Sequence, residues 1–230
     1  MIGWPLNLEQ VVALKPDLII GLASGQEQET YDLLSQIAPT VLANDQTSGD
    51  WQGVVQFMGQ VLGKPETANQ VITNYQKRID TLHQQLGGKF QETEVSVIRL
   101  YQDKISVYLE DSFIGNILAD AGFEQPTAQQ LNENQALAAL ENTVQQYISK
   151  ERLADVDGDV IFVVVYDYQP QIEQELQAQL KELQDDPLWS RLEAVQQDQV
   201  YLVGSHWIVS GPIAAQVVLD DLFQYLVEEG

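Results

Sequence analysis

The chain contains no cysteine among its 230 residues. Without thiols it cannot form disulfides, thiolate-bound zinc sites or iron–sulfur clusters, and it has no cysteine nucleophile. The same absence is compatible with an oxidising compartment but does not establish one. The lack of cysteine therefore excludes thiol-dependent sites but does not determine the cellular compartment of the protein.

Basic residues are scarce as well. The chain carries 11 Lys and Arg against 34 Asp and Glu, for a formal net charge of −23 at pH 7. Nucleic acids and anionic membrane surfaces are bound through basic patches, so this balance argues against both as partners. The acidic residues are spread along predicted helices, which is typical of a well-solvated acidic surface.

Long apolar runs are also missing. No stretch of about 18 apolar residues is present, so the sequence predicts no transmembrane helix, and no signal-peptide pattern is visible. Hydrophobic residues nevertheless make up 44% of the chain and charged residues 20%. This composition is that of an ordinary globular protein.

A short pattern occurs twice along the chain. Residues 7–20 read NLEQVVALKPDLII, and residues 149–162 read SKERLADVDGDVIF, 142 positions later (149 − 7). Each copy predicts a short helix with an acid near its start (Glu9, Glu151), then a turn and a buried strand. The offset is far longer than the ~20–50 residues of a solenoid repeat. The repeat therefore predicts two similar lobes with a ligand held in a cleft.

Alternating helix and strand patterns fill the first third of the chain, which is typical of α/β units on a parallel sheet. An uninterrupted amphipathic pattern then runs from Pro65 for about 20 residues, or about 30 Å of helix. We expect an α/β protein of two lobes, each with a mainly parallel sheet flanked by helices, joined by one long rigid helix. The predicted segments are an N-terminal lobe at 1–64, a linking helix at 65–87 and a C-terminal lobe at 88–230.

The second lobe has a clearer succession of elements. Val95–Tyr101 and Ile105–Leu109 predict a strand hairpin, and Ser112 is expected to cap a helix that Gly122 ends. Residues 143–148 are compatible with either an extended or a helical stretch. The later elements are expected at 160–166 and 199–203 (strands) and at 172–183, 187–192 and 213–226 (helices).

Five segments, in order, carry a family resemblance. They are NLEQVVALKPDLIIG (7–21), LLSQIAPTV (33–41), the long helix, VIRLYQDKISVYLEDSFIGNILADAGF (97–123) and SGPIAAQVVLDDL (210–222). Together they resemble the class III substrate-binding proteins of ABC importers, with the iron-siderophore (ferric dicitrate-type) branch closest. The resemblance covers essentially the whole chain and implies two α/β lobes that hold the ligand between them.

The resemblance also implies a function. The chain is expected to capture a ferric siderophore and deliver it to an ABC permease dimer, without enzymatic activity and with no cofactor besides the transported chelate. A periplasmic or lipid-anchored extracytoplasmic location is implied for the full-length protein. The alternatives are a haem or corrinoid ligand, a chelatase-like α/β enzyme, and a structural module without a ligand. Against the enzyme, the sequence shows no nucleophile–base pairing, glycine-rich phosphate loop or HxxE-type metal motif.

Members of this family usually carry a further β-α-β segment before the NLE motif. The first lobe is therefore expected to be incomplete at its N-terminus, through shortening of the chain, proteolysis or a wrongly assigned start. A parallel sheet without its early strands exposes an unpaired edge. We expect either edge-to-edge or swapped self-association, or low stability of the first lobe.

Glu9 and Glu151 are the candidate permease-docking residues. In the family that the chain resembles, one surface glutamate on each lobe meets arginines of the permease, and these two occupy the matching positions. The alternative is that each carboxylate only complements the dipole of its helix, worth about 0.3–1 kcal/mol.

Arg99 is the main candidate for ligand binding, since it lies within the apolar strand VIRLY. Its planar guanidinium suits carboxylate or catecholate oxygens, the groups that an arginine near this position often meets in the family. An internal ion pair or solvent exposure would also account for it. Strand alternation places Tyr101 on the same face as Arg99, which makes it a second ligand-binding candidate.

Four further residues are candidates for the ligand rim. Trp207 follows the strand predicted at 199–203, and Tyr166 is the last residue of the strand predicted at 160–166. The carboxyl ends of strands are where α/β sheets bind ligands, although Trp207 can also pack under the final helix. Ser24 follows the first strand and precedes a helix start, which suits an anionic ligand. Trp4 is placed at the same rim by the resemblance.

Histidine is limited to His83 and His206. His206 can ligate iron or a haem, but a hydrogen-bonded loop histidine is the commoner outcome. Binding of bare Mn²⁺ or Zn²⁺ needs a converging set of histidines and carboxylates, and the presence of only two histidines argues against it. No resident metal is therefore expected, and iron is expected to arrive already chelated.

Overall fold

The computed structural model describes residues 6–23, 28–43, 48–88, 93–101, 104–167 and 169–228. It divides into two compact units, Met1–Gln46 with Gln52–Asn69, and Thr47–Trp51 with Gln70–Gly230. No helix in the described ranges is long and apolar enough to cross a membrane. The lobe boundaries expected at residues 64 and 87 stay a prediction.

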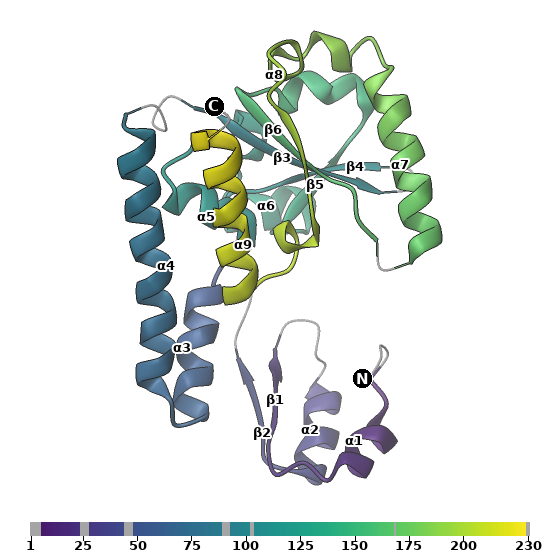
Figure 1. Cartoon of the computed structure of the whole chain (residues 1–230). Helices are drawn as coiled ribbons and strands as arrows, with labels where there is room; N and C mark the ends of the chain where they lie inside the picture. Colours follow the sequence, from purple (N-terminus) through teal and green to yellow (C-terminus); the bar gives the residue numbers. More distant parts are fainter. Residues whose placement is uncertain are drawn as a thin grey trace. The chain divides into compact units, whose positions relative to one another are not determined.

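The first unit is a small α/β arrangement (Figure 1). Its only paired strands in the described ranges are β1 (Ile19–Leu22) and β2 (Thr40–Ala43), which run in parallel. The side chain of Asn7 starts helix α1 by accepting a hydrogen bond from the backbone N–H of Gln10 at 3.1 Å. The helices of the unit are α1 (Leu8–Leu14), α2 (Gln28–Ile37) and most of α3 (Trp51–Val61).

Strand β1 is only half-buried. Ile20 is 36% exposed and Leu22 is 44% exposed, and an apolar pocket of about 360 Å³ lies among α1, β1 and β2. The prediction of a buried strand is therefore wrong for the first copy of the repeat, because a two-stranded sheet leaves much of each strand uncovered. Self-association through this unit stays a prediction.

The longest helix is α4 (Pro65–Leu86), and the helix predicted at 65–87 is present. It begins in the first unit and continues in the second, since the unit boundary falls after Asn69. Its start packs tightly on α3, where a Cβ on Gly59 would lie 2.5 Å from that of Ala68. Glycine at this position is therefore what allows the two helices to approach so closely.

The second unit is built on a five-stranded sheet of order β5-β4-β3-β6-β7. The pairs β3–β6 and β6–β7 are parallel, whereas β3–β4 and β4–β5 are antiparallel. The α/β class is confirmed, and the sheet is mixed because the predicted hairpin reverses the chain. The strands are β3 (Val95–Tyr101), β4 (Lys104–Tyr108), β5 (Gln145–Ile148), β6 (Val160–Val164) and β7 (Val200–Val203).

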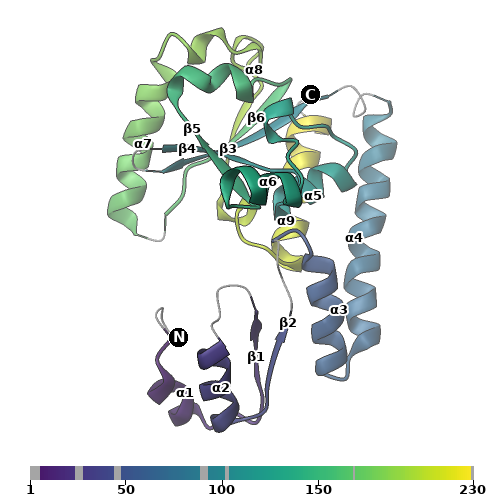
Figure 2. The same ribbon diagram turned by 180° about the vertical axis from the view of Figure 1, so that it is seen from behind.

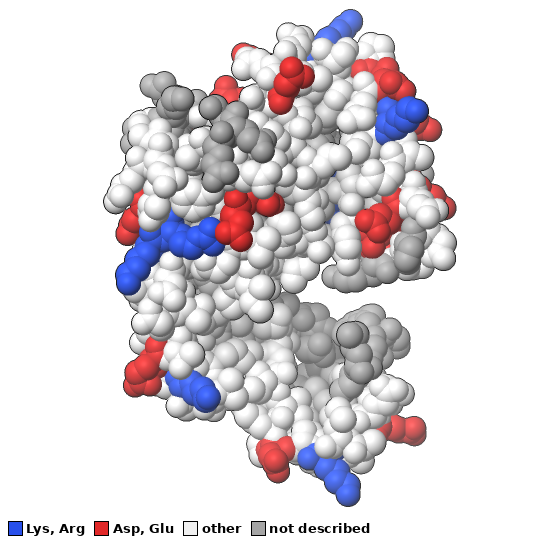
Figure 3. All heavy atoms as spheres, viewed as in Figure 1, with Lys and Arg blue, Asp and Glu red and all other residues white. Residues whose placement is uncertain are grey.

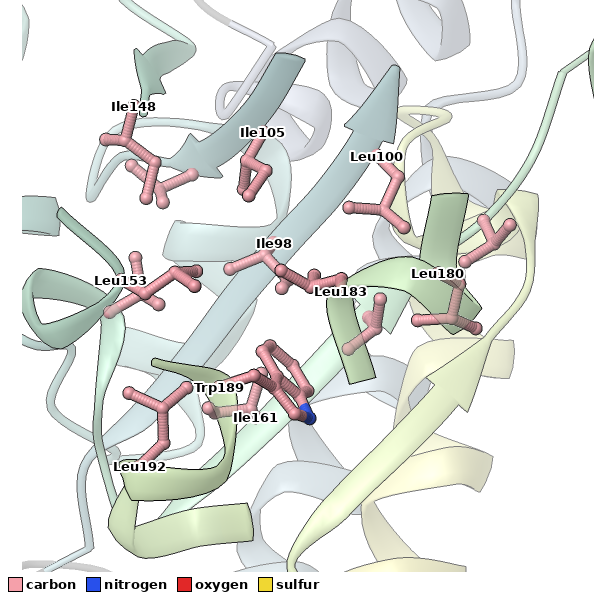
Figure 4. Close-up of a cluster of buried hydrophobic side chains, with 14 of the residues drawn as sticks. Ile98, Leu100, Ile105, Ile148, Leu153, Ile161, Leu180, Leu183, Trp189 and Leu192 are labelled. Atoms are coloured by element: carbon pink, nitrogen blue, oxygen red, sulfur yellow. The ribbon is translucent and has the colours of Figure 1, made fainter. Parts of the chain in front are cut away.

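One face of this sheet carries the main hydrophobic core (Figure 4). Ile98, Leu100 and Ile161 point from the strands toward Trp189 and the buried side of α7 (Pro170–Gln184). Alternation along the strands therefore leaves the odd-numbered residues of β3, among them Arg99 and Tyr101, on the opposite face.

The opposite face is divided in two. Over β6 and β7 it is covered by α9 (Pro212–Phe223), as the two views in Figures 1 and 2 show. There Phe162 lies 4.3 Å from Trp207 between ring centroids, and Tyr201 stacks on Tyr225 at 4.4 Å. Over β4, β5 and the carboxyl end of β3 the same face carries the polar residues described below.

Local signals in the second unit are confirmed. The Ser112 side chain accepts a hydrogen bond from the backbone N–H of Gly115 at 3.1 Å and caps α5 (Phe113–Asp120). Gly122 adopts a left-handed φ of 81° just after that helix. In the second copy of the repeat, the helix is a 3₁₀ helix at Lys150–Val156, followed by the fully buried β6.

Candidate functional site

The candidate site lies at the β3, β4 and β5 side of the second unit. Strand register places Arg99 opposite Ser106, and Ser106 opposite Tyr147, so the three residues form one row across the sheet. Tyr101 lies opposite Lys104 in the neighbouring row. Cross-strand neighbours on one face are close enough to interact, so the sheet gathers these polar side chains into one group.

The Arg99 guanidinium makes three contacts, two with Tyr101 and one with Tyr166. Its Nη1 donates to the Tyr101 hydroxyl at 2.9 Å and its Nη2 donates to the Tyr166 carbonyl at 3.4 Å. The guanidinium carbon lies 4.4 Å from the Tyr101 ring centroid, which is a cation–π contact. The expectation that Tyr101 neighbours Arg99 is confirmed, and Tyr166 contributes its backbone oxygen.

The charge of Arg99 is not neutralised by any carboxylate in the described part of the chain, and its buried Nε has no hydrogen-bond partner. The ion pair weighed as an alternative is thus not found there. A half-buried cation without a counter-charge is costly unless something else supplies the negative charge. Among the described residues, nothing supplies that negative charge to Arg99.

Tyr108 is buried and belongs to this group, since its hydroxyl is within hydrogen-bonding reach of the Arg99 and Tyr101 side chains. Burial raises the pKa of the Tyr108 hydroxyl to about 12, although the nearby positive charge of Arg99 acts in the opposite direction. The phenol is therefore neutral at ordinary pH, and it adds no negative charge that would compensate Arg99.

Three residues of the group were missed by the sequence analysis: Gln145, Tyr147 and Lys104. The Gln145 side chain accepts from the Tyr101 hydroxyl at 3.1 Å and donates to the Tyr147 hydroxyl at 3.1 Å. The Lys104 ammonium lies 4.7 Å from the Tyr147 ring centroid. The alternation of residues 145–148 as a strand is the signal that could have found the first two.

Trp207 occupies a different environment from the one expected of a ligand contact. The side chain has no exposed surface, and its indole Nε1 donates to Asp221 Oδ2 at 2.7 Å. The structure assigns Trp207 to core packing under the final helix, which was the alternative explanation. Because the Trp207 side chain is fully buried, it cannot contact a ligand directly, and the expectation that it does so is wrong.

His206 lies beside Trp207. Its Nε2 is 2.6 Å from Asp221 Oδ2, so it is the hydrogen-bonded loop histidine that was expected to be commoner than a metal ligand. The described residues contain no cluster of three or more His, Asp or Glu able to hold a metal ion.

Two candidates lie outside the described residues, namely Ser24 and Trp4. Their ligand contacts stay predictions. Tyr166 lies among the described residues and is half-buried, so a contact from its side chain also stays a prediction.

Glu9 and Glu151 lie on different units. Both are exposed and both stand in the first turn of a helix, α1 for Glu9 and the 3₁₀ helix for Glu151. The pKa of the Glu151 carboxyl is held below its usual range. The largest cause is a hydrogen bond from the Ser149 side chain, and the next is a hydrogen bond from the backbone of Glu151 itself. The exposed Glu151 side chain therefore stays negatively charged to a lower pH than an ordinary glutamate, which suits a contact with arginines.

Charge elsewhere on the surface is dispersed. On the face drawn in Figure 3, basic side chains stand singly or in small groups beside acidic ones. A separate pocket of about 320 Å³ in the second unit is lined by Glu110, Glu124 and five other residues. Its two carboxylates suit an anionic ligand poorly, in contrast to the surroundings of Arg99.

Comparison with known proteins gives a consistent result. A family model described as "Periplasmic binding protein" matches residues 3–206. The achromobactin-binding periplasmic protein of Dickeya dadantii is 32% identical over 222 residues, which cover 94% of this chain and 68% of that protein. The probable siderophore-binding lipoprotein YfiY of Bacillus subtilis is 34% identical over 225 residues, covering 96% of this chain and 66% of the relative.

A solved structure agrees with the sequence relatives. Staphylococcus aureus SirA complexed with staphyloferrin B superposes with a TM-score of 0.80 at 27% identity, covering 96% of this chain and 75% of SirA. This chain spans about two thirds of the length of the curated relatives that it matches. None of these three proteins is named for ferric dicitrate, so that branch in particular stays a prediction.

Proposed function

The chain belongs to the periplasmic binding protein family, and on that premise we propose that it binds a ferric siderophore and delivers it to the permease of an ABC importer. Its relatives are binding proteins named for chelates or siderophores, and one is named as periplasmic and another as a lipoprotein. An extracytoplasmic location for the full-length protein is part of the proposal.

One observation carries the binding proposal: Arg99 lies at the carboxyl ends of parallel strands without a carboxylate partner among the described residues. Its register partner on β6 is Val164, the last residue of that strand. Ligands of α/β sheets bind beyond the carboxyl ends of strands. A chelate with carboxylate or catecholate oxygens would supply the missing negative charge, in bidentate geometry if its oxygens are adjacent.

The permease contact is proposed for Glu9 and Glu151. Each unit presents one of them on its surface at a helix start. A pair of carboxylates, one on each unit, suits a dimeric permease whose two subunits offer equivalent arginines.

A fluorescence titration tests the binding proposal. Ferric citrate, a ferric catecholate and a ferric hydroxamate are added to the protein while tryptophan and tyrosine emission is recorded. Saturable quenching by at least one complex is expected, and Arg99→Ala should weaken the binding by about tenfold or more, the scale of a hydrogen bond to a charged group. Arg191→Ala, which removes an exposed arginine elsewhere in the second unit, is the matched control and should have no effect.

Two results would overturn the proposal. The first is the absence of quenching by every ferric complex. The second is tight binding of haem or a corrinoid, recognised by its visible absorption band, with none of the ferric chelates bound.

A further inference from the structure

Gln145 connects the polar residues around Arg99 into one hydrogen-bond network. Its Oε1 accepts from the Tyr101 hydroxyl at 3.1 Å and from the Ser106 hydroxyl at 2.8 Å, while its Nε2 donates to the Tyr147 hydroxyl at 3.1 Å. Gln145 is half-buried and lies on β5, next to β4. A single amide therefore joins three hydroxyl groups.

The direction of each hydrogen bond follows from Arg99. A guanidinium can only donate, so the Tyr101 hydroxyl must accept from Arg99 and place its own proton elsewhere. Gln145 Oε1 accepts that proton and also accepts from the Ser106 hydroxyl, and these two donors together fix the orientation of the amide. The Nε2 group is then turned to Tyr147, whose hydroxyl oxygen accepts and whose proton is left for a partner outside the network.

The outer edge of the network therefore presents donors. Tyr147 is 47% exposed, and the exposed Lys104 places its ammonium over the Tyr147 ring. No ion pair or hydrogen bond joins Arg99 or Lys104 to a carboxylate within the described ranges. In a chain with a net charge of −23, two cations that lack a carboxylate partner among the described residues, beside an outward phenol proton, form a local site for oxyanions.

This pattern discriminates among ferric chelates by charge. A ferric tris-hydroxamate is uncharged, because its ligand oxygens carry as much negative charge as the metal carries positive charge. Ferric catecholates and ferric hydroxycarboxylates keep surplus negative charge on oxygens. Donors and cations without an acceptor favour the second kind of complex.

We propose that Gln145 is a positioning residue that turns the Tyr147 hydroxyl outward as a donor, and that Tyr147, Lys104 and Arg99 together select anionic catecholate or hydroxycarboxylate chelates over uncharged hydroxamates. The inference rests on the proposed function and specifies the class of chelate. Neither Gln145 nor Tyr147 needs to bind iron.

The variant Gln145→Glu tests the positioning role. A carboxylate accepts at both oxygens, so the Tyr147 proton would turn inward and the outward donor would be lost. Binding of ferric citrate and of the ferric catechol complex should weaken by about tenfold or more, whereas binding of ferric acetohydroxamate should change little. Gln146→Glu is the matched control, because it adds the same charge one residue away on the opposite face of β5.

The variant Tyr147→Phe tests whether Gln145 acts through the phenol. It keeps the ring under Lys104 and removes only the hydroxyl, so the anionic complexes should bind several-fold more weakly. In the Tyr147→Phe background, Gln145→Glu should have a much smaller effect than it has alone. Thermal unfolding of each variant shows whether the fold is retained.

The outcomes separate the inference from the proposed function. If the parent protein binds none of the three complexes, the proposed function fails. If it binds them without regard to charge, or if Gln145→Glu and Gln146→Glu behave alike, the proposed function stands and the inference is overturned. A larger loss for the uncharged complex than for the anionic ones would also overturn it.

Discussion

The two copies of the repeated pattern lead into strands with very different surroundings. In the first copy, β1 pairs only with β2 among the described residues, and every second side chain is exposed. In the second copy, β6 lies between β3 and β7, and all five residues are buried. The same helix–turn–strand pattern can therefore lead into a half-exposed strand or into a fully buried one. The number of strands that pair with it in the sheet decides how much of the strand is buried.

The comparison extends to the helices that precede these strands. The first copy has an α-helix with a side-chain cap from Asn7, whereas the second has a 3₁₀ helix without one. Both helices still present an exposed glutamate in the first turn. The feature common to the two copies is therefore a surface carboxylate, which is what a shared partner would recognise.

The largest expected effect follows from reversing both carboxylates. The double variant Glu9→Lys/Glu151→Lys should abolish transport of the chelate in a reconstituted importer, because like charges then face the arginines of the permease. The affinity for the chelate should be unchanged. Reversal of Glu29 and Glu193, which are also exposed first-turn glutamates on the two units, should leave transport intact. Equal loss in both double variants would contradict a specific docking role.

The difference between the strands can be measured through their isoleucines. Ile161→Ala should reduce the free energy of unfolding of the second unit by about 2–5 kcal/mol, because this side chain is fully buried in the core. Ile20→Ala, at a position that is 36% exposed, should cost about 1 kcal/mol or less. Urea unfolding followed by hydrogen exchange reports each unit separately. Comparable losses would show that β1 is covered in solution.

The second unit is also expected to lose stability at alkaline pH. The unfolded pKa of tyrosine is about 10, and burial raises the pKa of Tyr108 to about 12 in the folded protein. Above pH 10 the unfolded chain releases a proton that the folded chain keeps. The free energy of unfolding should therefore fall by up to about 1.4 kcal/mol per pH unit between these values.

Tyr108→Phe should remove the part of the fall in the free energy of unfolding above pH 10 that the Tyr108 hydroxyl causes. Tyr75, which donates to Asp120 at 2.9 Å and whose pKa is also raised by burial, should account for a further share. A flat stability profile from pH 10 to pH 12 in the parent protein would contradict the raised pKa values.

The smallest effects concern the helix starts. Asn7→Ala should destabilise α1 by about 1 kcal/mol because it removes a cap. Ser149→Ala should change stability little, since its side chain makes no cap bond to the helix backbone. It should instead raise the pKa of Glu151, whose largest cause of lowering is Ser149. Carboxyl NMR titration measures that shift, and an unchanged pKa would refute the contact.

Local signals predicted most of the fold. The Ser112 cap, the hairpin and the long α4 depend on short-range chemistry that a single sequence displays directly. The exposure of β1 was not predictable in the same way, because it depends on how many strands join the sheet.

The candidate site was predicted in part. Arg99 was recognised because a cation in an apolar strand is conspicuous, and Tyr101 followed from alternation. Gln145 and Tyr147 were not recognised, since only the register of β5 on β4 brings them to Arg99. Trp207 illustrates the reverse error, because an aromatic residue after a strand has the same pattern whether it meets a ligand or a core.

The position of iron in crystals of the protein with a bound ferric chelate, located by its anomalous scattering, tests the central claim most directly. The account predicts chelate oxygens about 2.7–2.9 Å from the guanidinium nitrogens of Arg99, as in charge-assisted hydrogen bonds. A chelate bound without any contact to Arg99, for example in the pocket lined by Glu110 and Glu124, would contradict it.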